Sequence, residues 1–212
     1  MDLLDAIKGR RSINFFDPDL EITDDKIDEL LRLAHLAPSS FNLQPWRVVV
    51  VKSPERKKAL REHSMGQPKA EEASAVFIIV ADPDALEENV PRALDSWEKL
   101  GYLKPENRDG TENLMRSHYG EPGSFKRILF AVKNASLFAM NLMLAARGLG
   151  LETHPMDGFD EEALKKEFRI PEDKRVPMLV AVGKLREGTD LLPRAWRKNI
   201  DEFTGREYYD EK

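Results

Sequence analysis

The sequence predicts a single α+β domain, and three observations lead to that prediction. Apolar residues recur at every third or fourth position in several long stretches, which is typical of helices that bury one face. Short runs of branched apolar residues stand between these stretches and are typical of buried strands. The chain has 212 residues, of which 41% are hydrophobic and 33% charged, so one globular domain, residues 1–212, with a substantial core is expected.

Two helices are predicted before the first strand. The first is short, carries apolar residues on one face and ends near Gly9. The second begins at Thr23 or Asp24, where a side-chain oxygen can cap the helix, and Pro38 stops it. Its apolar stripe repeats at spacings of three and four: Ile27, Leu30, Leu31 and Ala34.

Two strands and a third helix follow. Residues 47–51 are a continuous run that is typical of a strand buried on both faces. Ser53 then offers a helix cap, with Pro54 in the first helical position and Glu55 in the first turn. Residues 76–80 predict a second buried strand.

The next part of the chain predicts a loop and a long helix. Residues 101–124 are polar, rich in glycine and proline and without periodicity, so they predict a lid, a binding loop or a mobile segment. Residues 125–149 predict one helix, and its middle, residues 135–144, is apolar nearly all round. Such a helix is expected to be buried on every side, and a second subunit is the simplest source of the missing surface.

The last part of the chain predicts a helix, a strand and an arm. Asp160 caps a helix that runs to Phe168, and residues 176–182 predict a third strand, interrupted by Pro177. The predicted order of elements is therefore α-α-β-α-β-α-α-α-β. The arm, residues 191–212, has no core of its own and is expected to lie on an apolar surface such as a partner protomer. Its apolar and aromatic residues are Leu192, Trp196, Ile200, Phe203, Tyr208 and Tyr209.

Composition makes several classes of protein and site improbable. The net charge is -5 and no basic run stands out, so nucleic acid is not an expected partner. The absence of cysteine removes disulfides, iron–sulfur clusters and thiolate nucleophiles, and the four histidines lack the spacing of a metal site. The longest apolar run, residues 135–146, is shorter than the roughly 20 residues that span a bilayer. With no signal peptide in view, the chain is expected to be soluble and cytoplasmic.

A loop rich in hydrogen-bonding groups is the first of three candidate functional motifs. It joins the second helix to the first strand, and its polar side chains do not ionise. Such a loop suits a neutral ligand edge that offers many hydrogen bonds, although an ordinary turn has the same residue types. The loop contains Pro38, Ser39, Ser40, Phe41, Asn42 and Gln44.

The other two motifs offer an anion site and a close backbone approach. Arg10-Arg11-Ser12 could hold a phosphate, because guanidinium groups match it bidentately and a hydroxyl adds a donor. The alternative is a solvated helix end. In the segment Pro155-Met156-Asp157-Gly158, the glycine lets the backbone approach a ligand, and the alternative is a plain turn before the next helix.

Together, in this order and spacing, the three motifs resemble the nitroreductase family of FMN-dependent oxidoreductases. The resemblance covers nearly the whole chain and is weakest between about residues 84 and 124. It implies a central, mainly antiparallel sheet flanked by helices, in an intertwined homodimer that exchanges its C-terminal arms. The cofactor-binding residues that it implies are Arg10, Arg11, Ser12, Asn14, Pro38, Ser39, Ser40, Asn42, Gln67, Lys69, Pro155, Met156, Asp157, Gly158, Arg194 and Arg197.

The resemblance also implies how these residues meet the cofactor. Arg194 and Arg197 would join the first motif at the FMN phosphate, and the backbone near Gly158 would approach flavin N5. Gln67 and Lys69 would touch the pyrimidine edge, where a cation offsets the negative charge of the reduced ring. At position 14 relatives often have a basic residue and this chain has asparagine, which changes the electrostatics of that edge.

The function implied by the resemblance is oxidation of NADH or NADPH by FMN and reduction of an electron-poor acceptor, such as a nitroaromatic, quinone or enone. One open face would serve both substrates in a ping-pong sequence, and no catalytic side chain and no metal are expected. Phe41 either borders the acceptor slot or packs in the dimer core. Three alternatives stay open: a specialised flavin oxidase or dehalogenase, a flavin-binding protein without turnover, and a dimeric interaction protein.

Overall fold

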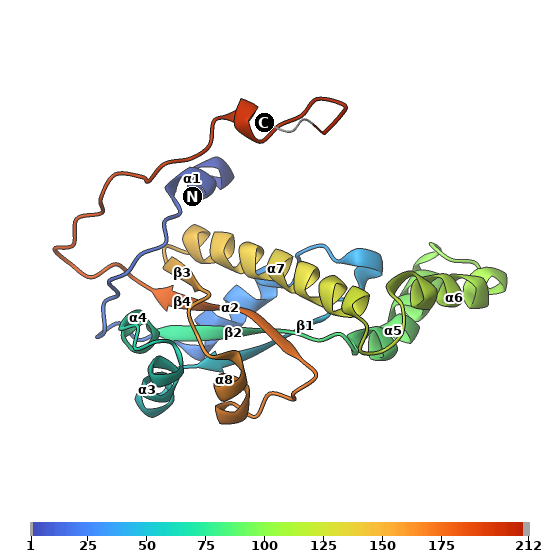
Figure 1. Ribbon diagram of the computed structural model, residues 1–212, viewed down its shortest axis with the longest axis horizontal. Coiled ribbons are helices and arrows are strands. Elements are labelled where there is room, and N and C mark those ends of the chain that lie inside the picture. Colours follow the sequence, from blue (N-terminus) through green and yellow to red (C-terminus); the bar gives the residue numbers. More distant parts are fainter. Residues whose placement is uncertain (1, 210–212) are drawn as a thin grey trace.

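A four-stranded antiparallel sheet forms the centre of the structure, and helices cover both of its faces (Figure 1). The structure is a computed structural model and describes residues 2–209. The strands follow the order β1-β2-β4-β3 and are β1 (Trp46–Val51), β2 (Ala75–Ala81), β3 (Glu152–Met156) and β4 (Arg175–Gly183). The α-helices are α1 (Leu3–Gly9), α2 (Asp24–Ala34), α3 (Pro54–His63), α4 (Lys69–Glu72), α5 (Ala85–Leu100), α6 (Arg108–Tyr119), α7 (Phe125–Gly148) and α8 (Glu161–Glu167). Short 3-10 turns are η1 (Ser40–Asn42), η2 (Pro105–Asn107) and η3 (Ile200–Glu202).

Strand β2 lies inside the sheet, and every one of its side chains is buried. Successive side chains of a strand point to opposite faces. Phe77 and Ile79 accordingly pack in a core with α2 and α7. Val76 and Ile78 pack on the other face with residues of α3, α4 and α8. Full burial of a side chain of this size contributes about 1.5–3 kcal/mol, so this one strand anchors both cores. The predicted α+β class and the predicted second strand are confirmed.

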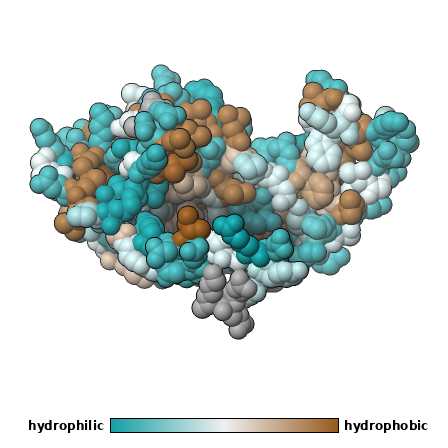
Figure 2. All heavy atoms as spheres, turned by 90° about the horizontal axis from the view of Figure 1, so that it is seen from above, coloured by the Kyte–Doolittle hydropathy of each residue, from teal (hydrophilic) through white to brown (hydrophobic). Residues whose placement is uncertain are grey.

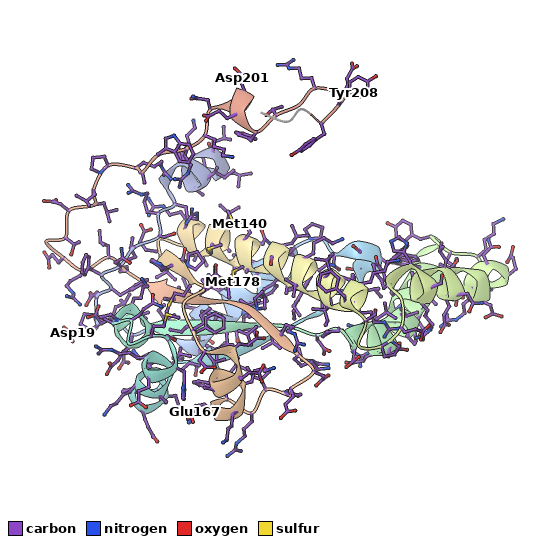
Figure 3. All side chains as sticks on the ribbon, in the orientation of Figure 1. Asp19, Met140, Glu167, Met178, Asp201 and Tyr208 are labelled. Atoms are coloured by element: carbon purple, nitrogen blue, oxygen red, sulfur yellow. The ribbon has the colours of Figure 1, made fainter. Side chains whose placement is uncertain are left out.

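Helix α7 lies along one face of the sheet. Its buried side chains recur at spacings of three and four, as for a helix with one face in a core. Within one chain the middle of α7 is buried on the sheet side only, and Leu137 and Met140 are exposed on the other side, so the expectation that a second subunit covers them stays a prediction. Figure 3 shows Met140 on the side of α7 away from the sheet. The helix is long and apolar enough to cross a membrane, but it packs against β2, β4 and α2 as a core helix of this fold.

The predicted helix starts are confirmed by their caps. The side chains of Thr23, Ser53 and Asp160 each accept a hydrogen bond from the backbone three residues further on, at the first turns of α2, α3 and α8. Helix α2 ends at Ala34, earlier than Pro38. Local chemistry therefore determines where these helices begin, as the sequence indicates.

The prediction that residues 101–124 form a loop is wrong. Helix α6 occupies half of this segment and packs against α5, and the two helices project from the rest of the molecule (Figure 1). Within α6 only Met115 and Tyr119 are buried. Because so few positions need to be apolar, the sequence of this segment lacks the apolar stripe by which a helix is recognised. An ion pair between Glu112 and Arg116, four residues apart, supports the helix instead.

Two predictions about strands are also wrong. Residues 47–51 lie on an edge strand that is only partly buried, because β1 has one neighbour in the sheet. The sequence predicts three strands, but residues 152–156 form a fourth, β3. Pro155 fits there because an edge strand has one side on which no ladder hydrogen bond is needed. Strand β4 passes through Pro177 without interruption, next to a shift in its register with β2.

A buried carboxylate fastens three strands at one end of the sheet. Asp82 follows β2, and its side chain is only 3% exposed. It accepts hydrogen bonds from Arg47 on β1, at 2.8 Å, and from Lys174 before β4, at 2.7 Å. Burial by itself would raise the pKa of Asp82, but the hydrogen bonds from these two cations outweigh it and hold the pKa below its ordinary value.

Asp82→Asn should lower the free energy of unfolding at pH 7 by about 2 kcal/mol, because it removes the charge from two hydrogen bonds that a buried carboxylate accepts. The two cations would keep only their other, more exposed carboxylate partners. An unfolded aspartate has a pKa of about 3.9, and the folded pKa is lower. The stability that ionised Asp82 contributes is thus present above the pKa of the unfolded state and is lost as pH falls through the pKa of the folded state. Urea titrations at pH 7 and pH 3 should show the difference between Asp82→Asn and wild type narrowing at the lower pH.

The matched control is Asp19→Asn, at an exposed carboxylate in a loop (Figure 3). It should change the free energy of unfolding by no more than about 0.5 kcal/mol at either pH. Equal effects of the two substitutions would mean that the ion pairs of Asp82 contribute nothing specific.

Candidate functional site

Segments from four distant parts of the sequence meet at strand β3. Ser12 forms a parallel bridge with Thr153, and the next residue donates its N–H to the Thr153 carbonyl at 3.2 Å. Lys69 donates to the Asn14 side chain at 2.9 Å, and Gln67 donates to the Gly158 carbonyl at 2.8 Å. The C-terminal arm joins them through Arg194. We call this group the β3 site; its predicted members are Arg10, Ser12, Asn14, Gln67, Lys69, Gly158, Arg194 and Arg197.

Three arginines from the two ends of the chain lie together in the β3 site. Arg194 donates to the carbonyls of Lys8 and Arg10, and Arg10 donates to the Ser12 hydroxyl at 3.4 Å. The pKa of Arg10 is lowered, first by its burial and then by the charges of Arg194 and Arg197. No carboxylate contributes to that balance. Cations that repel one another in this way are stabilised by a bound anion, and guanidinium groups suit the oxygens of a phosphate.

The turn after β3 approaches the turn before α4 closely. A Cβ atom on Gly158 would lie 2.9 Å from Nε2 of Gln67 and 3.4 Å from Sδ of Met65. The N–H of Asp160 donates to the His63 carbonyl at 2.9 Å and holds the same two turns together. A side chain at position 158 would therefore displace Gln67, whereas the predicted approach of this backbone to a ligand stays a prediction.

The side chains of some predicted site residues cannot all contact a ligand in this arrangement. The side chain of Met156 is buried in the core beneath the sheet, so only its backbone can face a ligand. Pro155 lies on the same strand and has no N–H to donate. Arg11 donates to the Leu192 carbonyl at 2.9 Å and fixes the start of the arm. Asp157 precedes Gly158 in the turn and is exposed.

The structure does not bring the loop of residues 38–42 to the β3 site of the same chain. This loop is fixed to the N-terminal half of α7, where the Ser40 N–H donates to the Asn134 side chain at 3.0 Å. Ser39 accepts from the Gln44 N–H at 2.9 Å. Strand β3 follows the opposite end of α7. Pro38, Ser39, Ser40, Phe41 and Asn42 thus form a second group, away from the first.

Phe41 is enclosed by aromatic residues of the projecting helices. Its ring centroid lies 6.2 Å from that of Trp97 on α5, and 6.3 and 6.1 Å from those of His118 and Tyr119 on α6. These contacts place it against the core of its own chain, and its predicted place in a dimer core stays a prediction. A role of Phe41 beside an acceptor stays a prediction.

His154 is a member of the β3 site that the sequence argument did not select. Its Nδ1 lies 2.6 Å from the Ile13 carbonyl oxygen. Burial lowers the pKa of His154, and the charges of Lys69 and Arg10 lower it further. The hydrogen bond to Ile13 acts in the opposite direction and is outweighed. The residue directly precedes the third motif, but its neighbours come from remote segments, so no local pattern reveals it.

Lys69 lies at the opposite end of the site. Burial lowers the pKa of Lys69, whose ammonium group is held by Asn14. No group of three or more His, Asp or Glu side chains that could hold a metal occurs within residues 2–209. The β3 site therefore has a group of arginines that suits an anion at one end and the Lys69 cation at the other. It also contains the turn at Gly158, which lies close to Gln67.

Comparisons with known proteins show the family and the fold. The model described as "Nitroreductase family" matches residues 7–184. The chain is 36% identical to "Putative NAD(P)H nitroreductase YdgI" of Bacillus subtilis over 86% of this chain and 88% of that protein. It is 34% identical to "NADH dehydrogenase" of Thermus thermophilus, over 86% of each. A "putative nitroreductase in complex with FMN" from Exiguobacterium sibiricum superposes with a TM-score of 0.85, at 29% identity and 97% coverage of both chains.

Gly158→Ala should lower the free energy of unfolding by about 1 kcal/mol, because the added methyl group displaces Gln67 and removes its hydrogen bond. Urea titration of the purified variant measures the change. Gly110→Ala is the matched control, since a Cβ there meets nothing within 4 Å in helix α6. It should raise stability by about 0.5 kcal/mol. If both variants gain stability, the two turns do not pack as described.

Proposed function

The chain belongs to the nitroreductase family, and from that membership we propose that it is an FMN-dependent oxidoreductase. It takes hydride from NADH or NADPH and reduces an electron-poor acceptor such as a nitroaromatic, quinone or enone. The two substrates use one site in turn, in a ping-pong sequence. Its relatives named as NAD(P)H nitroreductase and NADH dehydrogenase support the reductant, and a neighbouring structure solved with FMN supports the cofactor.

The observation that carries the proposal is the arginine cluster of the β3 site. Arg10, Arg194 and Arg197 approach one another although no carboxylate offsets the burial of Arg10. The terminal phosphate of FMN carries about -1.5 to -2 charges and three acceptor oxygens, so it fits this cluster. At the other end, Lys69 fits the edge of a ring that gains negative charge on reduction. Gly158 leaves room for the Gln67 side chain, which a Cβ there would meet, and so keeps that carboxamide beside the turn.

Bound FMN supplies the hydride chemistry, and the protein binds and orients it. Arg10 and Arg197 hold the phosphate, while the Ser12 hydroxyl adds a donor. Asn14 fixes the ammonium group of Lys69 through the hydrogen bond between them. This bond positions the cation without adding a second charge at position 14. No protein acid or base is required for hydride transfer, and we assign none.

We also propose a homodimer in the cytoplasm, with exchanged C-terminal arms. Apolar side chains remain exposed on α7, on α1 and on the arm. Viewed from the α7 side, apolar patches gather on this surface, which is hollowed between the main body and the projecting α5–α6 pair (Figure 2). A partner would cover these patches. It would also supply residues 38–42 to the β3 site, which one chain alone does not complete.

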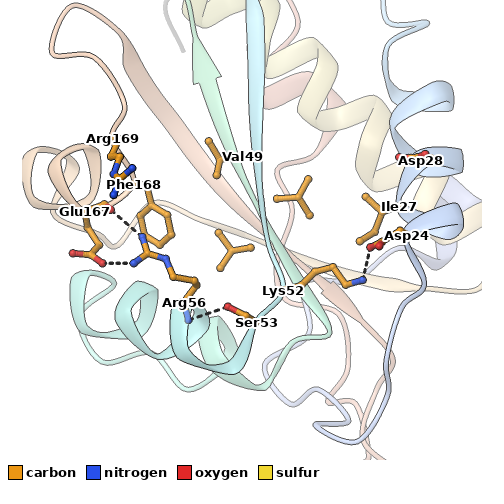
Figure 4. A pocket seen from close by; sticks show the side chains of 12 residues that line it. Asp24, Ile27, Asp28, Val49, Lys52, Ser53, Arg56, Glu167, Phe168 and Arg169 are labelled. Carbon is orange, nitrogen blue, oxygen red and sulfur yellow. Dashed lines mark hydrogen bonds and ion pairs between the residues drawn. The ribbon is translucent and has the colours of Figure 1, made fainter.

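The free edge of β1 offers a place for an exchanged arm. A cavity of about 690 Å³ runs along this edge and is lined by Val49, Lys52, Arg56 and Phe168 (Figure 4). Unpaired N–H and C=O groups of an edge strand favour addition of an extended segment. Beyond the two arginines assigned to the β3 site, residues 198–209 of the arm are mostly exposed. Residues 210–212 of the predicted arm lie outside the described residues.

The purified protein should be yellow, with an absorption band near about 450 nm, and should oxidise NADH or NADPH with a nitroaromatic or quinone acceptor. Initial rates at several acceptor concentrations should give the parallel double-reciprocal lines of a ping-pong sequence.

Arg10→Ala and Arg197→Ala should each weaken FMN binding by about 1.5–3 kcal/mol, the range for hydrogen bonds to charged groups. Fluorescence titration of the flavin-free protein measures the binding.

Arg92→Ala is the matched control for these substitutions. Arg92 lies on α5, is exposed and pairs with Glu88, so its removal should leave FMN binding unchanged. A colourless protein that binds no FMN would contradict the proposed function. Unchanged affinity in both site variants would remove the two arginines from the phosphate site.

Deletion of residues 193–212 should cost both the dimer and the flavin. Interfaces of obligate dimers often bury about 2,000 Å² or more, and the arm would provide part of that area as well as two phosphate-binding arginines. Light scattering and the flavin absorption measure the two losses. The double substitution Arg194→Ala, Arg197→Ala should lose flavin and keep the dimer. A truncated protein that stays dimeric and yellow would refute arm exchange.

A further inference from the structure

The ring of His154 is fixed in one tautomer by its surroundings. Its Nδ1 lies 2.6 Å from the carbonyl oxygen of Ile13. A carbonyl oxygen only accepts hydrogen bonds, so Nδ1 carries the proton. In the neutral ring Nε2 is then an acceptor with a free lone pair. No hydrogen bond to Nε2 is formed by any residue in the described range 2–209.

Two cations from different elements act on the charge of this ring. Arg10 follows α1, and Lys69 begins α4. Burial has the largest effect and lowers the pKa of His154, and the two positive charges lower it further. The hydrogen bond to Ile13 raises the pKa, but the other effects outweigh it, so the pKa stays below its ordinary value. The ring is consequently neutral at neutral pH, and its Nε2 can accept a hydrogen bond there.

We propose that Nε2 of His154 accepts a hydrogen bond from a ribityl hydroxyl of FMN, which makes His154 a cofactor-binding residue. The inference rests on the proposed function. Arg10 belongs to the phosphate end of the β3 site, and Lys69 belongs to the end assigned to the flavin ring. His154 is near both. The part of FMN that joins phosphate to ring is the ribityl chain, whose hydroxyls can donate.

A neutral acceptor also distinguishes a ribityl hydroxyl from the phosphate of FMN. The phosphate carries oxygens that accept, so it gains nothing from a lone pair on Nε2. A protonated ring would donate from both nitrogens and could no longer accept from a hydroxyl. Protonation would also place a third cation beside Arg10 and Lys69.

His154→Phe removes the acceptor and keeps a flat ring. It should weaken binding of FMN and of riboflavin by the same factor, about three- to tenfold, as for one neutral hydrogen bond. Lumiflavin, which has no ribityl chain, should bind wild type and variant equally. Fluorescence titration of the full-length flavin-free protein measures all three. His154→Gln, which keeps an acceptor oxygen, should recover most of the loss.

His35→Phe is the matched control, because His35 also directs Nδ1 to a backbone carbonyl, that of Arg32 at 2.7 Å, but lies on the exposed end of α2. Its flavin affinities should equal those of wild type. Riboflavin has no phosphate to titrate, so its affinity for wild type should fall as pH falls through the pKa of His154. His154→Phe should lack that fall.

The outcomes separate the inference from the proposed function. If wild type binds none of the three flavins, the proposed function fails. If wild type binds FMN and His154→Phe binds all three equally well, only the inference fails. Weaker binding of lumiflavin by the variant would place the contact on the ring or in the packing of residues 10–14. A loss confined to FMN would place it at the phosphate, and either result overturns the ribityl contact.

Discussion

The position of β3 at the edge of the sheet is the constraint on which the site depends. An edge strand has backbone groups on one side that no strand satisfies. Here the segment after α1 meets them: the Ile13 N–H donates to the Thr153 carbonyl at 3.2 Å, and the Ile13 carbonyl accepts from the His154 ring. Arg10 and Asn14 flank this contact in the sequence. The same hydrogen bonds that satisfy the edge therefore carry an arginine and the partner of Lys69 into the site.

Electrostatics rather than acid–base chemistry distinguishes this site. Lys69 and His154 have lowered pKa values chiefly because both are partly buried, and Arg10 has a lowered pKa for the same reason. The site thus gathers cations without the carboxylates that balance them elsewhere, as Asp82 balances Lys174. Such an arrangement is unfavourable in an empty protein and favourable around an anion. It matches a protein whose cofactor provides the reactive group.

The sequence predicts those parts of the structure that depend on local chemistry. The caps at Thr23, Ser53 and Asp160 and the buried run of β2 follow from residue types alone. The run of residues 47–51 has the same character as a central strand, because composition does not report how many neighbours a strand has. Helix α6 is hidden for a related reason: with two buried residues it lacks the stripe that marks a helix.

The sequence indicates the segments that contain the candidate site residues, but it does not show how these segments come together in space. The arginines, Gly158 and Lys69 stand in recognisable segments, but a sequence does not show that residues 38–42 lie apart from them in one chain. His154 illustrates the limit most clearly. Its tautomer is fixed by Ile13 and its charge by Lys69 and Arg10, so its properties exist only after three remote segments have met.

Backbone strain gives an independent reason to regard residues 38–44 as a binding loop. Phe41, Asn42 and Gln44 all adopt positive φ angles, of 53°, 56° and 45°. Non-glycine residues in this region cost about 1 kcal/mol or more each and persist only where surrounding contacts hold them. The contacts are visible here: Asn134 fixes the loop to α7, and the Phe41 ring fixes it to α5 and α6. A simple connection between α2 and β1 needs neither the strain nor two separate anchors. A loop whose shape must match a ligand needs both, and the projecting α5–α6 pair then serves to hold that shape.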